Sequence, residues 1–73
     1  MKKNNLSSLS QEVKYARKKA KLTQEDLALF AGVSRKFISE LENEKQTLEI
    51  GKVLDVLNAL GISLTIYNRL RDM

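Results

Sequence analysis

Apolar and polar residues follow a helical period over most of the first sixty positions. Between Ser8 and Lys21, apolar residues recur three or four positions apart and share one face of a predicted helix: Leu9, Val13, Ala16 and Ala20. Ser8 and Gln11 fit a capping box at the start of this helix. Residues 1–7 are largely polar, with two Asn and two Lys, and predict a disordered N-terminal tail.

The stretch LTQEDLALFAGVSRKFISELE, which begins at Leu22, predicts two short helices and a turn. Thr23, with an acidic residue three positions later, has the spacing of a capping box, and Gly32 can adopt the left-handed conformation that ends a helix. Ser34 supplies a second cap, which begins a helix from Arg35 to Asn43. Two capped helices this close in sequence must turn sharply, as in a helix-turn-helix. From spacing alone, an ordinary antiparallel helix pair in a small bundle is an equal alternative.

The second of these helices has two chemically distinct faces. Ile38 and Leu41 face a core by their spacing, whereas the opposite face is polar and rich in hydrogen-bond donors. Such a face is what the major groove of DNA requires. Phe37 can pack in the core or touch a thymine methyl group, and Glu40 can accept from cytosine or remain solvated. The candidate base-reading residues are therefore Ser34, Arg35, Lys36 and Ser39.

A final helix is predicted after a loop at residues 44–49. It begins at Ile50 or Gly51, ends at Leu60 and carries a nearly continuous apolar band. We expect this helix to be deeply buried or to contact a second chain. Gly61 is a signal for its C-terminal end.

The hydrophobic period changes from helical to two after Gly61. Ile62, Leu64 and Ile66 alternate with Ser63, Thr65 and Tyr67, which predicts a β-strand over residues 62–68, followed by a short polar tail at 69–73. The sequence predicts no second strand, so the most economical partner is the same strand of a second copy. Two-fold symmetry makes that pair antiparallel. The expected homodimer interface contains Leu60, Ile62, Leu64, Ile66 and Tyr67.

Composition excludes several classes of function. The chain has 73 residues, enough for one domain with a small core, and contains neither Cys nor His. Disulfides, thiolate metal sites and the usual general bases are therefore missing, and no Gly-rich phosphate loop is present. We expect no enzyme, no metal and no cofactor. No apolar run approaches membrane-spanning length and no signal peptide is visible, so the predicted location is the cytoplasm.

The net charge of +4 is unevenly distributed. Residues 1–21 carry seven Lys or Arg residues against Glu12 alone, whereas residues 22–61 carry seven acids against four bases. A basic helix can follow a DNA backbone, but a solvated face is an equal explanation for Lys18 and Lys19.

The stretch LTQEDLALFAGVSRKFISELENEK resembles the helix-turn-helix of the phage-repressor-like (Cro/CI, XRE) family. The matching features are Thr-Gln at the start of the first helix, Ala28, Gly32 and the Ser-x-x-Glu from Ser39 to Glu42. This resemblance covers about Val13 to Leu64. It implies an all-α, repressor-like bundle of four to five helices over residues 8–61, with the C-terminal strand pairing across a homodimer.

The resemblance also assigns roles to individual residues. It implies an ion pair between Arg17 and Glu42, the alternative being two independent surface charges. The family usually has Gly where this chain has Glu44, and often Pro where it has Gln46. The turn after the recognition helix must then be carried by Asn43 or Glu44, and Asn adopts a left-handed conformation more readily.

The segment LNALGISLTIYNR narrows the resemblance to HipB-type antitoxins, in which a C-terminal strand pairs across the dimer. Their usual partner is a HipA-like kinase toxin. General XRE repressors also read LGISL here but continue as a helix.

The sequence thus predicts a dimeric repressor that binds a near-palindromic operator in double-stranded DNA. Its expected phosphate-binding residues are Thr23, Gln24, Asn43 and Lys45, which flank the recognition helix. As the antitoxin of a HipA/HipB-type operon, it would regulate its own synthesis and restrain a kinase toxin. One alternative is a stand-alone phage-type XRE regulator without a toxin. Another is a protein-interaction module whose main task is to bind the toxin.

Overall fold

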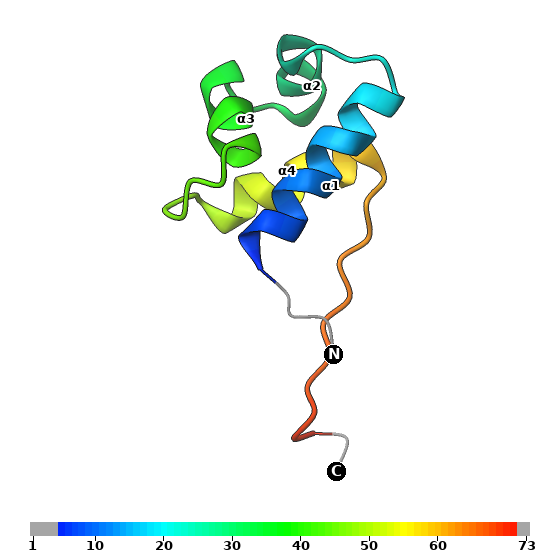
Figure 1. The fold of residues 1–73 in the computed structure, drawn as a ribbon, viewed down its shortest axis with the longest axis vertical. Helices are drawn as coiled ribbons and strands as arrows, with labels where there is room; N and C mark the ends of the chain where they lie inside the picture. Colours follow the sequence, from blue (N-terminus) through cyan, green and yellow to red (C-terminus); the bar gives the residue numbers. More distant parts are fainter. Residues whose placement is uncertain (1–4, 72–73) are drawn as a thin grey trace.

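Side-chain caps set the start of three of the four helices in the computed structural model, which describes residues 5–71 (Figure 1). Asn5 Oδ1 accepts from the backbone N–H of Ser8 at 2.9 Å. Thr23 and Asp26 form a reciprocal capping box, and Ser34 Oγ accepts from Phe37 N at 3.0 Å. These caps begin α1 (Leu6–Lys19), α2 (Gln24–Ala31) and α3 (Arg35–Glu42), and α4 (Ile50–Leu60) begins without a side-chain cap.

The first helix begins two residues earlier than the sequence predicted. Its cap is Asn5 rather than Ser8, and Gln11 Nε2 donates to Ser7 Oγ at 3.2 Å instead of closing a box with Ser8. Both Asn5 and Ser8 are good capping residues, and the earlier one adds a helical turn that includes Leu6. The predicted tail is therefore shorter than residues 1–7, of which residues 1–4 lie outside the part of the chain described here.

The helices end in a common way, with a left-handed residue just beyond the last turn. Gly32 (φ 73°) and Gly61 (φ 71°) do so at no steric cost, whereas Lys21 (φ 60°) and Glu44 (φ 65°) carry a Cβ into this region. Of the two residues predicted to carry the turn after α3, Glu44 does so, and Asn43, the residue that adopts this conformation more readily, does not. Asn43 stays at φ −98°, where its Nδ2 donates to the carbonyl of Ser39 at 2.9 Å, and the turn passes to Glu44.

All four helices contribute to a single apolar core. Its buried members are Val13, Leu27, Ala28, Phe37, Ile38, Leu41, Val53, Val56 and Leu57. Phe37 is 8% exposed, so it packs in the core rather than facing solvent. Ala20, which was predicted on the apolar stripe of the first helix, is exposed, and the apolar side chains of Phe30 and Leu54 also lie outside this core, 72% and 39% exposed.

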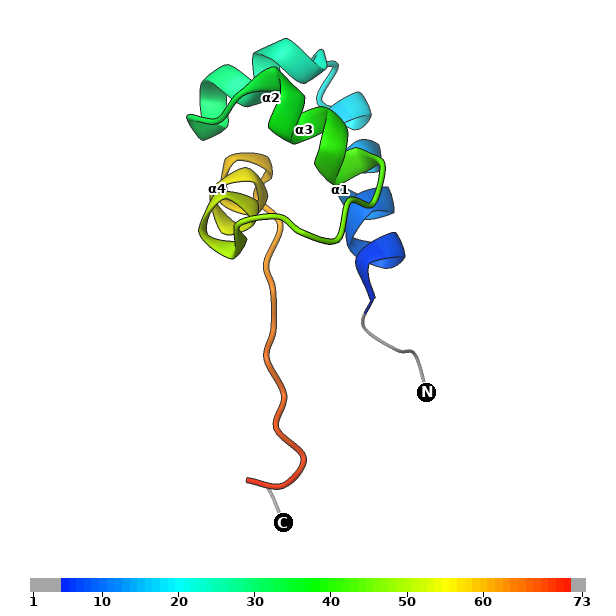
Figure 2. The same ribbon diagram turned by 90° about the vertical axis from the view of Figure 1, so that its left-hand side faces the viewer.

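The chain after Gly61 extends away from the bundle, as Figures 1 and 2 show in orange and red. Ile62 still packs against the core, and its N–H donates to the carbonyl of Leu57 at 2.9 Å. Beyond it, residues 63–68 belong to neither a helix nor a paired strand. Within residues 5–71 the structure has four helices and no strand, so the strand pairing predicted for a dimer is not formed by one chain alone. None of these helices is long and apolar enough to cross a membrane.

Replacing Glu44 with Gly should raise the free energy of unfolding. The left-handed conformation costs a non-Gly residue about 1–2 kcal/mol, and the extra freedom of unfolded Gly offsets about half of that gain. We expect a net stabilisation of about 0.5–1 kcal/mol, measured by urea denaturation. The matched control is Gly32→Ala, where no atom lies within 4 Å of the added Cβ, so that the expected loss reports the backbone conformation alone. An unchanged midpoint for Glu44→Gly would contradict the prediction.

Candidate nucleic-acid interface

The outer face of α3 is the most donor-rich surface of the helix-turn-helix. Ser34, Arg35 and Lys36 are exposed at its N-terminal end, and Ser39 is partly exposed one turn later. The opposite face is fixed in the core by Phe37, Ile38 and Leu41. Arg35 and Lys36 form no ion pair with any residue from 5 to 71. The helix therefore presents its long donors to solvent while its apolar face holds it in place.

Ser34 combines two tasks at the start of α3. Its Oγ accepts the backbone N–H of Phe37, which satisfies one of the free donors at the helix start. Within the described chain, no hydrogen bond uses the Ser34 hydroxyl as its donor. The hydroxyl can therefore donate to an outside acceptor, such as a phosphate or a base edge.

The residues after α3 are already engaged within the protein. Asn43 Nδ2 donates to Ser39 O at 2.9 Å and lies 3.4 Å from Ser39 Oγ. Lys45 Nζ lies 3.0 Å from Glu40 Oε2, so Glu40 pairs with a cation rather than remaining solvated. Both side chains of that pair are partly exposed, and exposed pairs contribute only about 0–1 kcal/mol. A phosphate can therefore replace Glu40 as the partner of Lys45 at small cost.

A three-residue network joins the helices behind this surface. The Arg17 guanidinium forks onto the Glu42 carboxylate, with Nε–Oε2 2.6 Å and Nη2–Oε1 3.0 Å, and its Nη1 donates to the carbonyl of Leu22 at 2.9 Å. Gln24 Nε2 donates to Glu42 Oε1 at 3.2 Å. One carboxylate at the end of α3 thereby binds α1 and the first residue of α2.

Glu42 carries its charge in a nearly closed environment, since its side chain is only 2% exposed. Burial alone would raise the pKa of this carboxyl. Hydrogen bonds from Arg17 and Gln24, with the positive charges of Arg17 and Lys14, outweigh burial and hold the pKa below its ordinary value of 4.5. The hydrogen bond to Glu42 likewise raises the pKa of Arg17. The pair is thus ionised at neutral pH.

Ser10 provides a second link from α1 to the end of α3. Its buried hydroxyl donates to the carbonyl of Leu41 at 2.5 Å. The sequence analysis missed this residue. The sequence contains one weak signal for it: Ser10 lies three positions before Val13, on the buried stripe, where a polar residue needs a hydrogen-bond partner.

The start of α2 is the second part of the interface. Thr23 Oγ1 accepts from Asp26 N, and Thr23 N donates to Asp26 Oδ2, each at 3.0 Å. The bond from the Thr23 backbone, with that from its side chain, holds the pKa of the exposed Asp26 carboxyl below its usual value. The Gln24 side chain is turned toward Glu42, so the exposed Thr23 and the backbone N–H groups of the first turn are what this helix start presents to solvent.

No metal site is formed by His, Cys, Asp or Glu side chains over residues 5–71. The surface described above offers hydrogen-bond donors and positive charge, and three of its acids, Glu40, Glu42 and Asp26, are paired or used in a cap. This chemistry fits a polyanion better than a small-molecule substrate.

Comparison with known proteins agrees with this geometry. Residues 13–67 match the HTH_3 family model, described as helix-turn-helix. The chain is similar to an uncharacterized HTH-type transcriptional regulator, y4mF, of Sinorhizobium fredii, with 50% identity over 54 residues, or 74% of this chain and 71% of that protein.

Solved structures of similar fold include HipB proteins. HipB in a HipA–HipB–O2–O3 complex has a TM-score of 0.81 and 25% identity, over 94% of this chain and 97% of that chain. HipB in a complex with an O4 20mer has a TM-score of 0.80, also with 25% identity, over 94% and 97% of the two chains. A mutant of the restriction–modification controller protein C.Esp1396I has a TM-score of 0.71 and 33% identity, over 86% of this chain and 80% of that chain.

Removing either member of the Arg17–Glu42 pair should strongly destabilise the domain. Arg17→Ala leaves a buried carboxylate without its counter-ion, and Glu42→Ala leaves the guanidinium without its acceptor. Each change should cost about 3–5 kcal/mol of unfolding free energy at pH 7, a large share of the stability of a small domain. Thermal and urea denaturation measure the loss. Melts equal to the parent's would show that the pair contributes nothing to folding.

The pH dependence gives an independent control on this assignment. Because the folded pKa of Glu42 lies below its unfolded value, its contribution to stability is complete above the unfolded pKa and is lost as pH falls through the folded one. Stability of the parent should therefore decline below about pH 5. Glu42→Gln should start lower at neutral pH and decline less steeply in acid. Parallel curves for the two proteins would contradict this role of Glu42.

Proposed function

We propose that this chain, which belongs to the helix-turn-helix family and is a transcriptional regulator of the XRE type, represses transcription as a homodimer bound to a near-palindromic operator. The observation that carries the proposal is the two-sided α3, whose donor-rich face is exposed while its apolar face is buried. No chemical step is needed for this activity. The site of action is the chromosome, and hence the cytoplasm.

Base reading is proposed for the exposed donors of α3. Arg35 and Lys36 have the reach and charge to donate to guanine O6 and N7, and Ser34 and Ser39 can bind either purine edge. Phe37 lies in the core and is left out of this set. The N-terminal end of α3 would enter the major groove, as in other helix-turn-helix proteins.

Phosphate binding is proposed for the groups on either side of α3. At the start of α2, the Thr23 hydroxyl and the backbone N–H of Gln24 face outward, while the Gln24 side chain steadies Glu42. Beyond α3, Lys45 exchanges Glu40 for a phosphate, and Asn43 supports it from the capping position. These contacts would fix the register of the duplex without reading its sequence.

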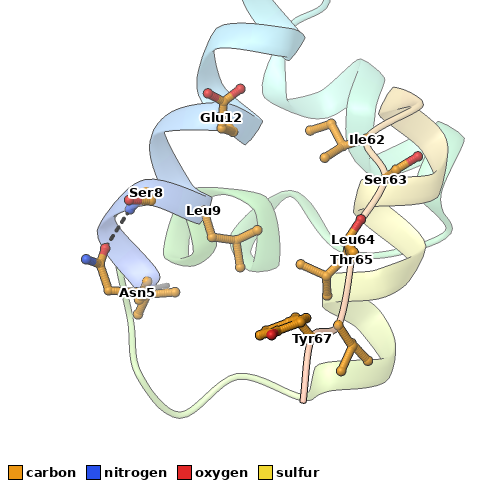
Figure 3. Close-up of a pocket in the computed structure, with 11 residues that line it drawn as sticks. Asn5, Ser8, Leu9, Glu12, Ile62, Ser63, Leu64, Thr65 and Tyr67 are labelled. Carbon is orange, nitrogen blue, oxygen red and sulfur yellow. Dashed lines mark hydrogen bonds between the residues drawn. The ribbon is translucent and has the colours of Figure 1, made fainter. Parts of the chain in front are cut away.

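Dimerisation is proposed for the extended segment at residues 62–68. Figure 3 shows this segment opposite the first turns of α1, with Leu9, Leu64 and Tyr67 directed into the space between. This groove has a volume of about 620 Å³ and is lined mainly by apolar side chains, among them Leu6 and Ile66. Leu64, Ile66 and Tyr67 are more than half exposed in the single chain, and a second chain would cover them.

The same segment of a second copy is the occupant we propose. The backbone N–H and C=O groups of residues 63–67 form no hydrogen bond within the described chain, so a second copy of the segment can pair with them. Both copies carry the same alternating apolar pattern. Two-fold symmetry makes the pair antiparallel, with Leu60 and Ile62 at its edges. Two recognition helices related in this way would enter successive major grooves about 34 Å apart.

An antitoxin role is the finer form of the proposal. It is supported by the similarity to HipB structures, which contain operator DNA and, in one case, HipA. The partner would be a HipA-like kinase. The similarity to a restriction–modification controller protein favours the alternative, a regulator without a toxin. Co-expression with a kinase-like protein encoded beside this chain separates the two: stable co-purification supports the antitoxin, and its absence supports the stand-alone regulator.

Replacing Arg35 with Ala should remove operator recognition while leaving the fold intact. Arg35 is exposed and unpaired within residues 5–71, and a bidentate contact to a base contributes about 1–3 kcal/mol. We expect the ratio of operator to random-duplex affinity to fall by one to two orders of magnitude, measured by fluorescence anisotropy. Lys52→Ala on α4 is the control of equal charge. If Arg35→Ala discriminates as well as the parent, α3 is not the reading helix.

Placing Asp at both Leu64 and Ile66 should prevent dimerisation. Two charges buried in the proposed strand pair would lack partners, so the variant should be monomeric by light scattering at micromolar concentration. Its binding to a palindromic site should approach that of a single half-site. The matched control places Asp at Ser63, on the opposite face of the segment. A monomeric parent, or a double variant that still dimerises, would refute the proposed interface.

A further inference from the structure

Three lysines in the second half of α1 and in the turn after it are not part of the DNA-binding surface proposed for α2 and α3. Lys14, Lys18 and Lys21 are exposed, and none forms an ion pair with a residue that the structure describes. Lys14 and Lys18, four residues apart, lie on one edge of the helix, and Lys21 follows in the turn after its C-terminal end. We call these three residues the lysine stripe.

The position of the lysine stripe follows from Arg17, which lies on the same edge of α1. Arg17 binds Glu42 at the end of α3 and the carbonyl of Leu22 just before α2. Lys14 lies close enough to act electrostatically on the same Glu42 carboxylate. The lysine stripe therefore lies on the edge of α1 that carries Arg17, next to the end of α3 and the residue before α2.

We propose that the lysine stripe is a second backbone-binding site, which engages duplex phosphates flanking the groove that α3 occupies. This inference rests on the proposed DNA-binding function and extends it beyond the helix-turn-helix itself. The ligand is the phosphodiester backbone, because a lysine ammonium is a flexible point charge with no planar fork for reading a base pair. The stripe would add affinity and salt dependence but no sequence preference.

The charge distribution supports phosphate over a protein partner. The acidic residue of α1, Glu12, is exposed and lies away from the stripe. Glu42, which lies beside the stripe, is already paired with Arg17. The three ammonium groups are solvated, so they pay little to approach a phosphate, and each contact would release a condensed counter-ion. Lys19 is a control for these lysines. It lies two positions after Arg17, which on an α-helix is a different side of α1.

The test compares Lys14→Gln/Lys18→Gln with Lys19→Gln in the full chain. Affinity for a duplex carrying the chain's own promoter, and for a random duplex of equal length, is measured across a salt series. We expect the double variant to reduce the slope of log affinity against log salt by about 3.6 for the proposed homodimer, since each of its four lost phosphate contacts removes about 0.9. Its discrimination between the two duplexes should equal the parent's, and Lys19→Gln should behave as the parent.

A duplex trimmed at its flanks gives the second arm. Trimming should weaken the parent more than the double variant, because Lys21 is the one residue of the stripe with which the variant can still hold the flanking phosphates. An unchanged slope, or trimming that affects both proteins equally, would overturn the lysine stripe even if Arg35→Ala loses discrimination as proposed. A parent that binds no duplex would instead overturn the DNA-binding function on which the inference rests. Thermal melts confirm that the substituted proteins are folded.

Discussion

The buried carboxylate of Glu42 is the interaction on which the arrangement of the helix-turn-helix depends. It receives the guanidinium of Arg17 from α1 and the amide of Gln24 from α2, while belonging itself to α3. The Ser10 hydroxyl holds the neighbouring carbonyl of Leu41. A recognition helix of eight residues is too short to be stable alone, so its direction has to come from such contacts and from its apolar face. The polar network sits at one end of α3, which leaves the other end free to approach a groove.

This division explains why the same helix can be both rigid and chemically available. Near its N-terminus, α3 is stabilised by the Ser34 cap, which uses the acceptor function of the hydroxyl and leaves the proton free. Near its C-terminus, charge and hydrogen bonds are directed inward. Arg35 and Lys36 form no ion pair within residues 5–71, so in the proposed base-reading role their identity would follow the DNA sequence rather than the stability of the domain.

Features set by neighbouring residues were predictable, and those set by competition or by distant partners were not. The Thr23–Asp26 box, the Ser34 cap and the left-handed Gly32 follow from local chemistry and are present as predicted. Where two nearby residues could perform the same task, the choice between them was not predictable. Asn5 rather than Ser8 caps α1, and Glu44 rather than Asn43 carries the turn after α3. Ser10 and the Lys45–Glu40 pair depend on where α1 and α3 come to lie, which spacing alone does not reveal. The segment at 62–68 shows the same limit, because its alternating pattern predicts a strand, but no strand is formed within residues 5–71.

The absence of histidine and cysteine from the sequence has a consequence for how such a regulator senses its surroundings. The one carboxylate that organises the recognition helix has its pKa lowered further from neutrality, and arginine and lysine stay charged well above it. The Arg17–Glu42 pair therefore keeps its charges near neutral pH. The attraction of the proposed DNA-binding surface to a polyanion varies instead with ionic strength, through screening and counter-ion release. In the proposed complex with DNA, affinity would therefore depend on salt concentration more than on pH.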